Sequence, residues 1–380
     1  MTEAASIEIP PTLREATADQ PAARLALAGA LAAGPTHAYL FAGPPGAGKR
    51  TAARAFAGEI LAIGSADPDD ARRRAVLDPS PHPDLVWLVP PGTQHLVEDV
   101  RERVIKGAAY RPFEGERRVF VIEAAEAMAD ESQNALLKTL EEPPEFVHLI
   151  LLTAEPAALL ETVTSRCQEV RFAPLSAQAV EERLGATQAP PRERAAAASL
   201  SGGDAARALY LLSPAGRELR ARAEACARAA RAGSASGRPW LALLEAAEEA
   251  GEKTGDEASA RVREAQETLP AARRRGREAE EAGRRAARAR RTEVLDLSLA
   301  LCGAWFRDIA AVAEGAPELA MNRDRSDELG ADAEGLTPGT ARRAAELVLE
   351  TRRNLQVNVA EELAVEALFY RVEALLRPAS

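Results

Sequence analysis

The sequence predicts an α/β domain with a phosphate-binding loop, followed by a small helical lid and a long all-α region. Three observations carry this prediction. A glycine-rich loop, "FAGPPGAGKRT" at 41–51, lies between an apolar run and a helical pattern. Short apolar runs then alternate with helical patterns until about residue 170. Beyond that point the strand patterns stop, so the rest of the chain is expected to be helix and loop.

The elements of the first region follow from spacing and from flanking glycine or proline. Strands are predicted at 37–43, 84–90, 117–125 and 148–154. Helices are predicted at 21–34, 51–62, 96–108 and 128–142. Short, almost wholly apolar strands that alternate with helices indicate a parallel sheet covered by helices on both faces.

The later part of the chain divides by composition. We expect an α/β domain at 1–170, a helical lid at 171–213 and a helical oligomerisation domain at 214–380. The segment 273–291 carries nine arginines and three glutamates. It reads either as a solvated, charge-balanced helix or as a surface that contacts DNA phosphates or an acidic partner.

Bulk composition narrows the function classes. The 380 residues are 46% hydrophobic but only 4% aromatic, which suits closely packed helices of small side chains. A net charge of −10 excludes a uniformly basic nucleic-acid binder, although a local basic patch stays open. No apolar run is long enough to span a bilayer and no leader is recognised, so we expect a cytoplasmic protein with no membrane partner. Three widely spaced cysteines suggest neither a disulfide framework nor a metal site.

The glycine-rich loop has the composition of a phosphate cradle. Its backbone N–H groups and its lysine are the candidate nucleotide ligands, and they belong to Gly43, Gly46, Gly48 and Lys49. The next position, where a hydroxyl normally holds magnesium, is Arg50. Thr51 comes one residue later, and on a helix that shift turns its side chain by about 100°. The loop therefore predicts phosphate binding with a doubtful metal position.

A carboxylate pair at the end of a buried strand completes such a site. Here the strand "VFVI" is followed by "EAAE", so Glu123 fills the metal-orienting position but Ala124 stands where a base would activate water. Glu126 is a weaker substitute. The hydrolytic step thus lacks its base.

Longer motifs now point to a family. "NALLKTLEEPP" at 134–144 and "LLTAEPAALLETVTSRCQEVRF" at 151–172 resemble the AAA+ subunits of bacterial clamp loaders. The loop region, "HPD" at 82–84 and "NLQVNVAEELAVEAL" at 354–368 are more specifically similar to the delta-prime subunits of DNA polymerase III. The resemblance implies an AAA+ domain, a lid and an all-α collar.

The resemblance also implies residue roles. Arg166, within Ser165–Arg166–Cys167, matches the arginine finger that reaches the ATP of a neighbouring subunit in trans; the alternative is a local salt bridge. Thr153 matches the first sensor position, with a backbone-bonding hydroxyl as the alternative. Where the family has a sensor arginine, this chain has Ala206, and Arg207 falls one place late. The four-cysteine zinc module of many relatives is missing, since His82 alone supplies a zinc ligand in that stretch.

The expected function follows from these matches. The chain would be a stator of the clamp loader, which places the sliding clamp on primed DNA, and its partners would be gamma/tau-type ATPases and a delta-type subunit. It would belong to the DNA-directed DNA polymerase holoenzyme, with ATP possible in a degenerate site, no zinc, and weak or absent ATPase of its own. The alternatives are a motor subunit that hydrolyses ATP itself and a DNA-binding helical scaffold.

Overall fold

The computed structural model describes residues 8–90, 94–266, 275–355 and 360–377, and, among these, not the side chains of 261, 264–266 and 275–278. The chain divides into two compact units, 1–175 and 176–380. Two sequence features lie partly outside the described residues: Arg273 and Arg274 of the arginine run, and 356–359 of the C-terminal motif.

The first unit contains a parallel sheet of five strands in the order β2-β3-β4-β1-β5. The strands are β1 (Ala38–Ala42), β2 (Leu85–Leu88), β3 (Arg118–Ile122), β4 (Val147–Thr153) and β5 (Gln168–Arg171). Ala42 of β1 is in register with Thr153 of β4, so the carboxyl ends of the central strands meet at one edge. In sheets of this type, ligands bind outside that carboxyl edge.

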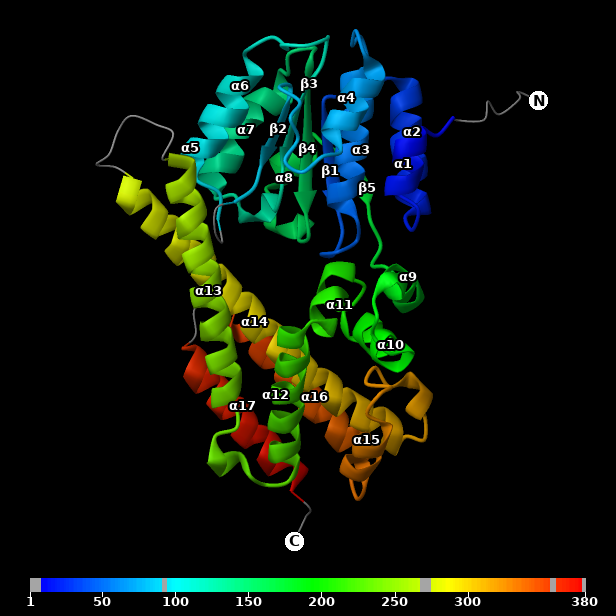
Figure 1. Ribbon diagram of the computed structural model, residues 1–380, viewed down its shortest axis with the longest axis vertical. Coiled ribbons are helices and arrows are strands. Elements are labelled where there is room, and N and C mark those ends of the chain that lie inside the picture. Colours follow the sequence, from blue (N-terminus) through cyan, green and yellow to red (C-terminus); the bar gives the residue numbers. More distant parts are fainter. Residues whose placement is uncertain (1–7, 91–93, 267–274, 356–359, 378–380) are drawn as a thin grey trace, which may run out of the picture. The chain divides into compact units, whose positions relative to one another are not determined.

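Helices cover both faces of the sheet, as Figure 1 shows. One face is covered by α1 (Pro11–Ala16), α2 (Pro21–Ala33), α3 (Lys49–Ala62) and α4 (Pro68–Ala75). The other is covered by α5 (Val97–Asp99), the π-helical η1 (Val100–Ile105), α6 (Lys106–Ala108), α7 (Asp130–Glu141) and α8 (Glu161–Thr164). Successive residues of β1 feed the two cores in turn, because Tyr39 and Phe41 face the α3 side while Ala38 and Leu40 face the α7 side.

The predicted fold class is confirmed, and all four predicted strands are present. The fifth strand was missed because only Val170 of β5 is buried, which leaves no apolar run to detect. Helices α1 and α4 were missed as well. α4 begins at an Asp67 N-cap followed by Pro68, and its apolar face is no more than Ala71 and Ala75.

The second unit is helical throughout its described residues. It begins with α9 (Ala177–Arg183), α10 (Pro191–Leu200), α11 (Ala205–Leu212) and α12 (Pro214–Arg231). It continues with α13 (Leu241–Gln266), α14 (Arg275–Ala313), α15 (Ser326–Ala333), α16 (Pro338–Leu355) and α17 (Glu361–Leu376), and short 3-10 turns follow α9, α12 and α14. None of the described helices in either unit is long and apolar enough to cross a bilayer.

Small residues let α13 and α14 pack closely as an antiparallel pair. A Cβ added to Gly255 would lie 2.9 Å from the carbonyl oxygen of Gly283, and one added to Gly283 would lie 2.8 Å from that of Gly255. Buried polar contacts fix other helices of this unit: Arg220 on α12 pairs with Asp324 at 2.6 Å. The low aromatic content of the sequence therefore reflects packing by glycine and alanine.

Candidate functional site

The glycine-rich loop follows β1 directly and leads into α3. A Cβ on Gly43 would lie 2.2 Å from the backbone oxygen of Phe172, so only glycine fits between β1 and the segment that follows β5. Gly46 and Gly48 have φ of 73° and 88°, the left-handed region that glycine enters without steric cost. The loop thus has the backbone conformation of a phosphate cradle, with the N-terminus of the 14-residue α3 behind it.

Lys49 is folded over this loop. Its ammonium donates hydrogen bonds to the carbonyl oxygens of Gly43 and Pro44, the second at 2.8 Å. These carbonyls lie in the loop itself, so the positive charge is held at the place where phosphate oxygens are expected. That the glycine backbone and Lys49 together bind phosphate stays a prediction.

Gln20 is hydrogen-bonded to the loop, and the sequence analysis did not predict this contact. Its side-chain amide donates to the carbonyl oxygen of Ala47 at 3.0 Å and to that of Ala173 at 2.6 Å. The Ala173 N–H donates back to the Gln20 side-chain oxygen at 3.0 Å. Gln20 is only 5% exposed, so one buried amide joins the loop to the chain that leaves β5. The sequence carries only a weak signal for it, a glutamine just before the helix-starting Pro21.

The strand-end carboxylate lies beside the arginine that replaces the metal-binding hydroxyl. The Trp87 indole N–H donates to Oε2 of Glu123 at 2.9 Å, and Nε of Arg50 lies 3.6 Å from the same oxygen. Arg50 also pairs with Asp78 at 2.8 Å. The carboxylate that would orient a metal ion is therefore already neutralised by a side chain of the same domain.

A second arginine one helical turn later completes this cluster. Arg54 pairs with Asp78 at 2.7 Å and its guanidinium carbon lies 4.2 Å from the centre of the Trp87 ring. Burial lowers the pKa of Arg54, while the Asp78 carboxylate counters part of that shift. We name Arg50, Arg54, Asp78, Trp87 and Glu123 the arginine–carboxylate cluster. Its members come from four separate segments, α3, the chain after α4, β2 and the end of β3, which is why only Arg50 and Glu123 stood out in the sequence.

At the same edge of the sheet, the side-chain oxygens of Glu126 and Thr153 accept hydrogen bonds from backbone N–H groups. Ala124 has φ of 50°, a left-handed conformation, and carries no group that can accept a proton. Glu126 accepts the Ala154 N–H at 3.1 Å, so its carboxylate anchors the end of β4. The Thr153 hydroxyl accepts the Glu155 N–H at 3.0 Å, which is the strand-end role considered as the alternative to a sensor. Thr51 is exposed on the first turn of α3.

Arg166 lies away from this loop. It comes two residues before Gln168, which is paired with Tyr39 in the first half of β1, whereas the loop follows Ala42. Strands rise about 3.3 Å per residue, so roughly 10 Å of strand separates these two levels of the sheet. Arg166 thus belongs to the amino edge and the loop to the carboxyl edge.

The Arg166 guanidinium is accessible and loosely paired. It donates to the Thr162 carbonyl oxygen at 2.9 Å and pairs with Glu141 at 2.7 Å. The side chains of Arg166 and Glu141 are 35% and 49% exposed. The local salt bridge considered in the sequence analysis is therefore present in the isolated chain. The neighbouring Cys167 thiol is packed against the α7-side core, and burial raises its pKa to about 12.

The "HPD" motif has a structural task. Asp84 is fully buried, and its carboxylate accepts the N–H groups of Phe113 and Glu114, both at 2.8 Å. Nδ1 of His82 accepts the Asp84 N–H at 3.1 Å, and burial lowers the pKa of His82. This histidine thus holds the loop before β3, and it belongs to no group of three or more potential metal ligands among the residues that the structure describes.

The lid positions lie in the second unit. Ala206 is exposed in the first turn of α11, whose N-cap is Asp204, and Arg207 is the next residue of the same turn. That Ala206 removes a nucleotide-sensing arginine, and that the chain binds no zinc, stay predictions.

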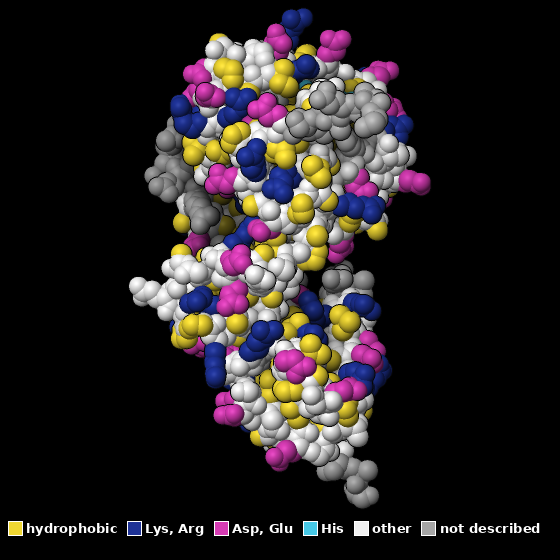
Figure 2. Space-filling model, turned by 90° about the vertical axis from the view of Figure 1, so that its right-hand side faces the viewer, with side chains coloured by type: hydrophobic (Ala, Val, Ile, Leu, Met, Phe, Trp, Pro, Cys, Tyr) yellow, Lys and Arg dark blue, Asp and Glu magenta, His cyan; other side chains and the backbone are white. Residues whose placement is uncertain are grey.

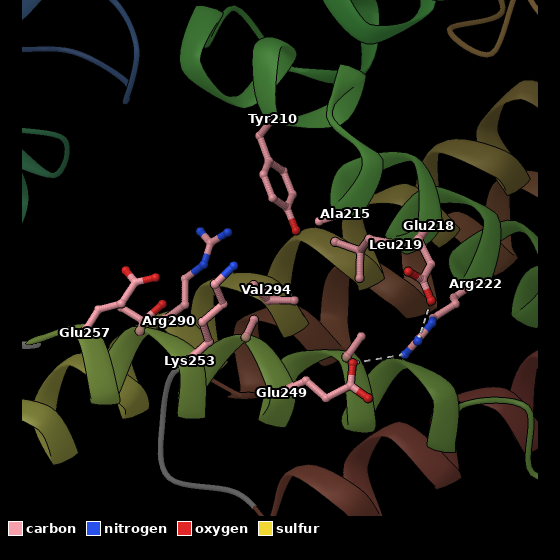
Figure 3. A pocket seen from close by; sticks show the side chains of 13 residues that line it. Tyr210, Ala215, Glu218, Leu219, Arg222, Glu249, Lys253, Glu257, Arg290 and Val294 are labelled. Carbon is pink, nitrogen blue, oxygen red and sulfur yellow. Dashed lines mark hydrogen bonds and ion pairs between the residues drawn. The ribbon is translucent and has the colours of Figure 1, made fainter.

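A cavity of about 580 Å³ lies within the second unit and is lined mainly by residues of α12, α13 and α14. Figure 3 shows Arg290 and Lys253 pointing from α14 and α13 toward Tyr210. The Arg290 guanidinium carbon lies 5.0 Å from the centre of the Tyr210 ring, and Arg290 also pairs with Glu293 at 2.8 Å. Charges of both signs line this cavity.

Most of the described arginine side chains of this run are paired with carboxylates. Arg284, Arg285 and Arg291 lie within 3.4 Å of Glu280, Glu281 and Glu248, respectively. Figure 2 shows the side that lies to the right in Figure 1, away from the start of α14, and there basic (dark blue) and acidic (magenta) side chains intermingle without a patch of one sign. These pairs favour the charge-balanced helix over a DNA-binding surface.

Comparison with known proteins finds one family model that matches most of the first unit. Residues 20–176 match the family model described as "DNA polymerase III, delta subunit". The match covers less than half of the chain, and it makes residues 20–176 similar to this family. The matched residues include the loop, the whole arginine–carboxylate cluster and Arg166.

Curated relatives match 34–39% of this chain. DNA polymerase III subunit delta' of Bacillus subtilis is 34% identical over 154 residues, 39% of this chain and 46% of that protein. The delta' subunit of Pseudomonas aeruginosa is 36% identical over 34% of this chain and 41% of its own length. The tau/gamma subunit of Haemophilus influenzae is 34% identical over 39% and 22%. The chain thus spans less than half the length of these curated relatives.

Proposed function

We propose that this chain is a delta-prime-like stator of the DNA polymerase III clamp loader, which lacks effective ATPase activity and donates Arg166 to the ATP of a neighbouring subunit. The observation that carries the proposal is the separation of two halves of an ATPase site on one sheet. The loop and Glu123 lie at the carboxyl edge, and Arg166 lies toward the amino edge. An arginine so placed serves a nucleotide held by another chain.

The contacts of Arg166 suit that role. A surface ion pair such as Arg166–Glu141 contributes roughly 0–1 kcal/mol, because solvent screens both partners. A guanidinium held so weakly exchanges its carboxylate for the more highly charged terminal phosphate of ATP at little cost. An arginine finger of this type accelerates phosphoryl transfer by on the order of 10³–10⁵.

The chain's own site supports the absence of hydrolysis. Arg50 replaces the magnesium-binding hydroxyl, Ala124 replaces the base, and Glu126 is bonded to the backbone of β4. Two steps of the usual chemistry, metal placement and activation of water, therefore lack their groups. The relatives named delta' and the family model agree with a subunit whose contribution is made within the assembled loader.

The test is ATP hydrolysis by the reconstituted loader in the presence of sliding clamp and primed DNA. Arg166→Ala is expected to lower the rate by an order of magnitude or more while assembly stays intact. Arg166→Lys keeps the charge but loses the planar fork, so it should rescue less than about a tenth of the lost rate. The matched control is Arg171→Ala, an exposed arginine paired with Glu169, which should leave the rate unchanged. An unchanged rate for Arg166→Ala would overturn the trans-acting role.

A motor subunit is the second candidate, favoured by the complete glycine cradle and by Lys49. ATP turnover by the isolated chain separates the two. The stator proposal expects no turnover above that of Lys49→Ala, whereas turnover that this substitution abolishes would establish a motor.

A further inference from the structure

The metal position of the phosphate loop does not fit a magnesium ion. In phosphate-loop proteins the ion is held by a hydroxyl after the loop lysine and by an acidic residue at a strand end. Here the hydroxyl position is Arg50, and Oε2 of the strand-end Glu123 accepts the Trp87 indole N–H at 2.9 Å. No group of three or more acidic, histidine or cysteine side chains forms a metal site among the described residues.

A protein cation stands in the place of the ion. Arg50 lies between two carboxylates, 2.8 Å from Asp78 and 3.6 Å from Glu123. Its position is fixed by its neighbours, because Arg54 occupies the other oxygen of Asp78 at 2.7 Å. A divalent cation entering here would meet a fixed guanidinium and a carboxylate that is already neutralised.

Arg50 is nevertheless accessible from the loop side. Its side chain is 48% exposed and stands on the first turn of α3, directly after Lys49. Two adjacent cations therefore follow a cradle of glycine N–H groups. Guanidinium groups bind phosphate oxygens through paired N–H donors and cannot lose their proton at physiological pH.

We infer that the loop binds a nucleoside di- or triphosphate without a divalent cation, with Arg50 bridging Glu123 and the phosphate in place of magnesium. The inference rests on the part of the proposed function in which the chain retains a phosphate cradle that does not hydrolyse ATP. It assigns to Arg50 a binding role and not merely the loss of a metal ligand. Nucleotide here stabilises the loop and is not turned over.

The experiment measures the dissociation constants of ADP, ATP and pyrophosphate for the full chain by calorimetry, once with magnesium and once with EDTA. For the unmodified chain the two values should agree within about threefold. Pyrophosphate distinguishes the sources of the ligand chemistry: binding equal to that of ADP would mean that phosphate alone is recognised. A loss of tenfold or more in EDTA, or no binding under either condition, would overturn the inference.

Variants sharpen this measurement. Arg50→Thr restores a hydroxyl and should make binding magnesium-dependent, with at least about tenfold weaker affinity in EDTA than in magnesium. Arg50→Lys keeps a cation and should stay metal-independent. Arg101→Thr is the matched control, because Arg101 is 46% exposed and also forms a surface ion pair, with Glu131. If Arg50→Thr does not create magnesium dependence, Arg50 does not replace the ion.

This result is independent of the clamp-loader assignment. The stator proposal is tested on Arg166 and on hydrolysis by neighbouring subunits. Failure of metal-free binding would therefore leave it standing, and failure of the Arg166 test would leave the nucleotide measurement intact.

Discussion

Arginine side chains at the two edges of the sheet in the first unit differ in the number of contacts that they make. At the carboxyl edge, Arg50 and Arg54 are tied to Asp78, Glu123 and the Trp87 ring. At the amino edge, Arg166 is held by one half-exposed carboxylate and one carbonyl oxygen. The first arrangement gives Arg50 two carboxylate partners and buries Arg54, whereas the second gives Arg166 a single carboxylate that it can exchange. The comparison indicates that a degenerate nucleotide site can be recognised from the ion pairs that its charged side chains already make within the chain.

The strongest test of this contrast at the loop is Gln20→Ala. It removes both amide contacts of a buried side chain and leaves the Ala173 N–H without its acceptor. The expected loss is about 2 kcal/mol in the free energy of unfolding of the first unit, as for buried hydrogen-bonding groups left unpaired. Hydrogen exchange of residues 43–49 should show the loop opening more often.

The control is Gln178→Ala, whose amide contacts only the exposed Glu182. It should leave both stability and exchange unchanged. If Gln20→Ala behaves like this control, the loop is not braced by its surroundings and the contrast between a fixed and a loose edge fails.

A smaller effect is expected at the other edge from Glu141→Gln. Because Glu141 competes with phosphate for Arg166, weakening the pair should raise ATP hydrolysis of the reconstituted loader by up to about fivefold, the rate equivalent of 1 kcal/mol. Glu169→Gln is the control, since it alters the pair with Arg171 only. A lower rate would mean that Glu141 orients Arg166 for catalysis, and the amino edge would then be as fixed as the carboxyl edge.

The smallest effect concerns Ala124, which follows Glu123 in a left-handed conformation. Such a conformation costs an alanine about 1–2 kcal/mol, and glycine avoids that cost but loses more backbone entropy on folding. Ala124→Gly should therefore stabilise the first unit by about 0.5 kcal/mol, measured by urea unfolding. Ala158→Gly, in a short helical turn without positive φ, should instead destabilise it. A destabilised Ala124→Gly would contradict the observed backbone at the end of β3.

The sequence by itself determined the α/β class, the four apolar strands, the glycine cradle and the clamp-loader resemblance of the first region. These features are local: periodicity of apolar residues, glycine at turns and short motifs are written in consecutive positions. It also marked Arg50 and Ala124 as departures, because each occupies a position that the loop or the strand end defines.

Only the tertiary structure decided what those departures mean. Gln20, Asp78 and Trp87 are far from the loop in the sequence, and nothing in their own neighbourhoods predicts that they meet it. β5 escaped detection because a strand with one buried residue has no apolar pattern. The opposite placement of Lys49 and Arg166 follows from the register of parallel strands, which is a long-range property. Local patterns specify elements, whereas the pairing of charges depends on which elements the core brings together.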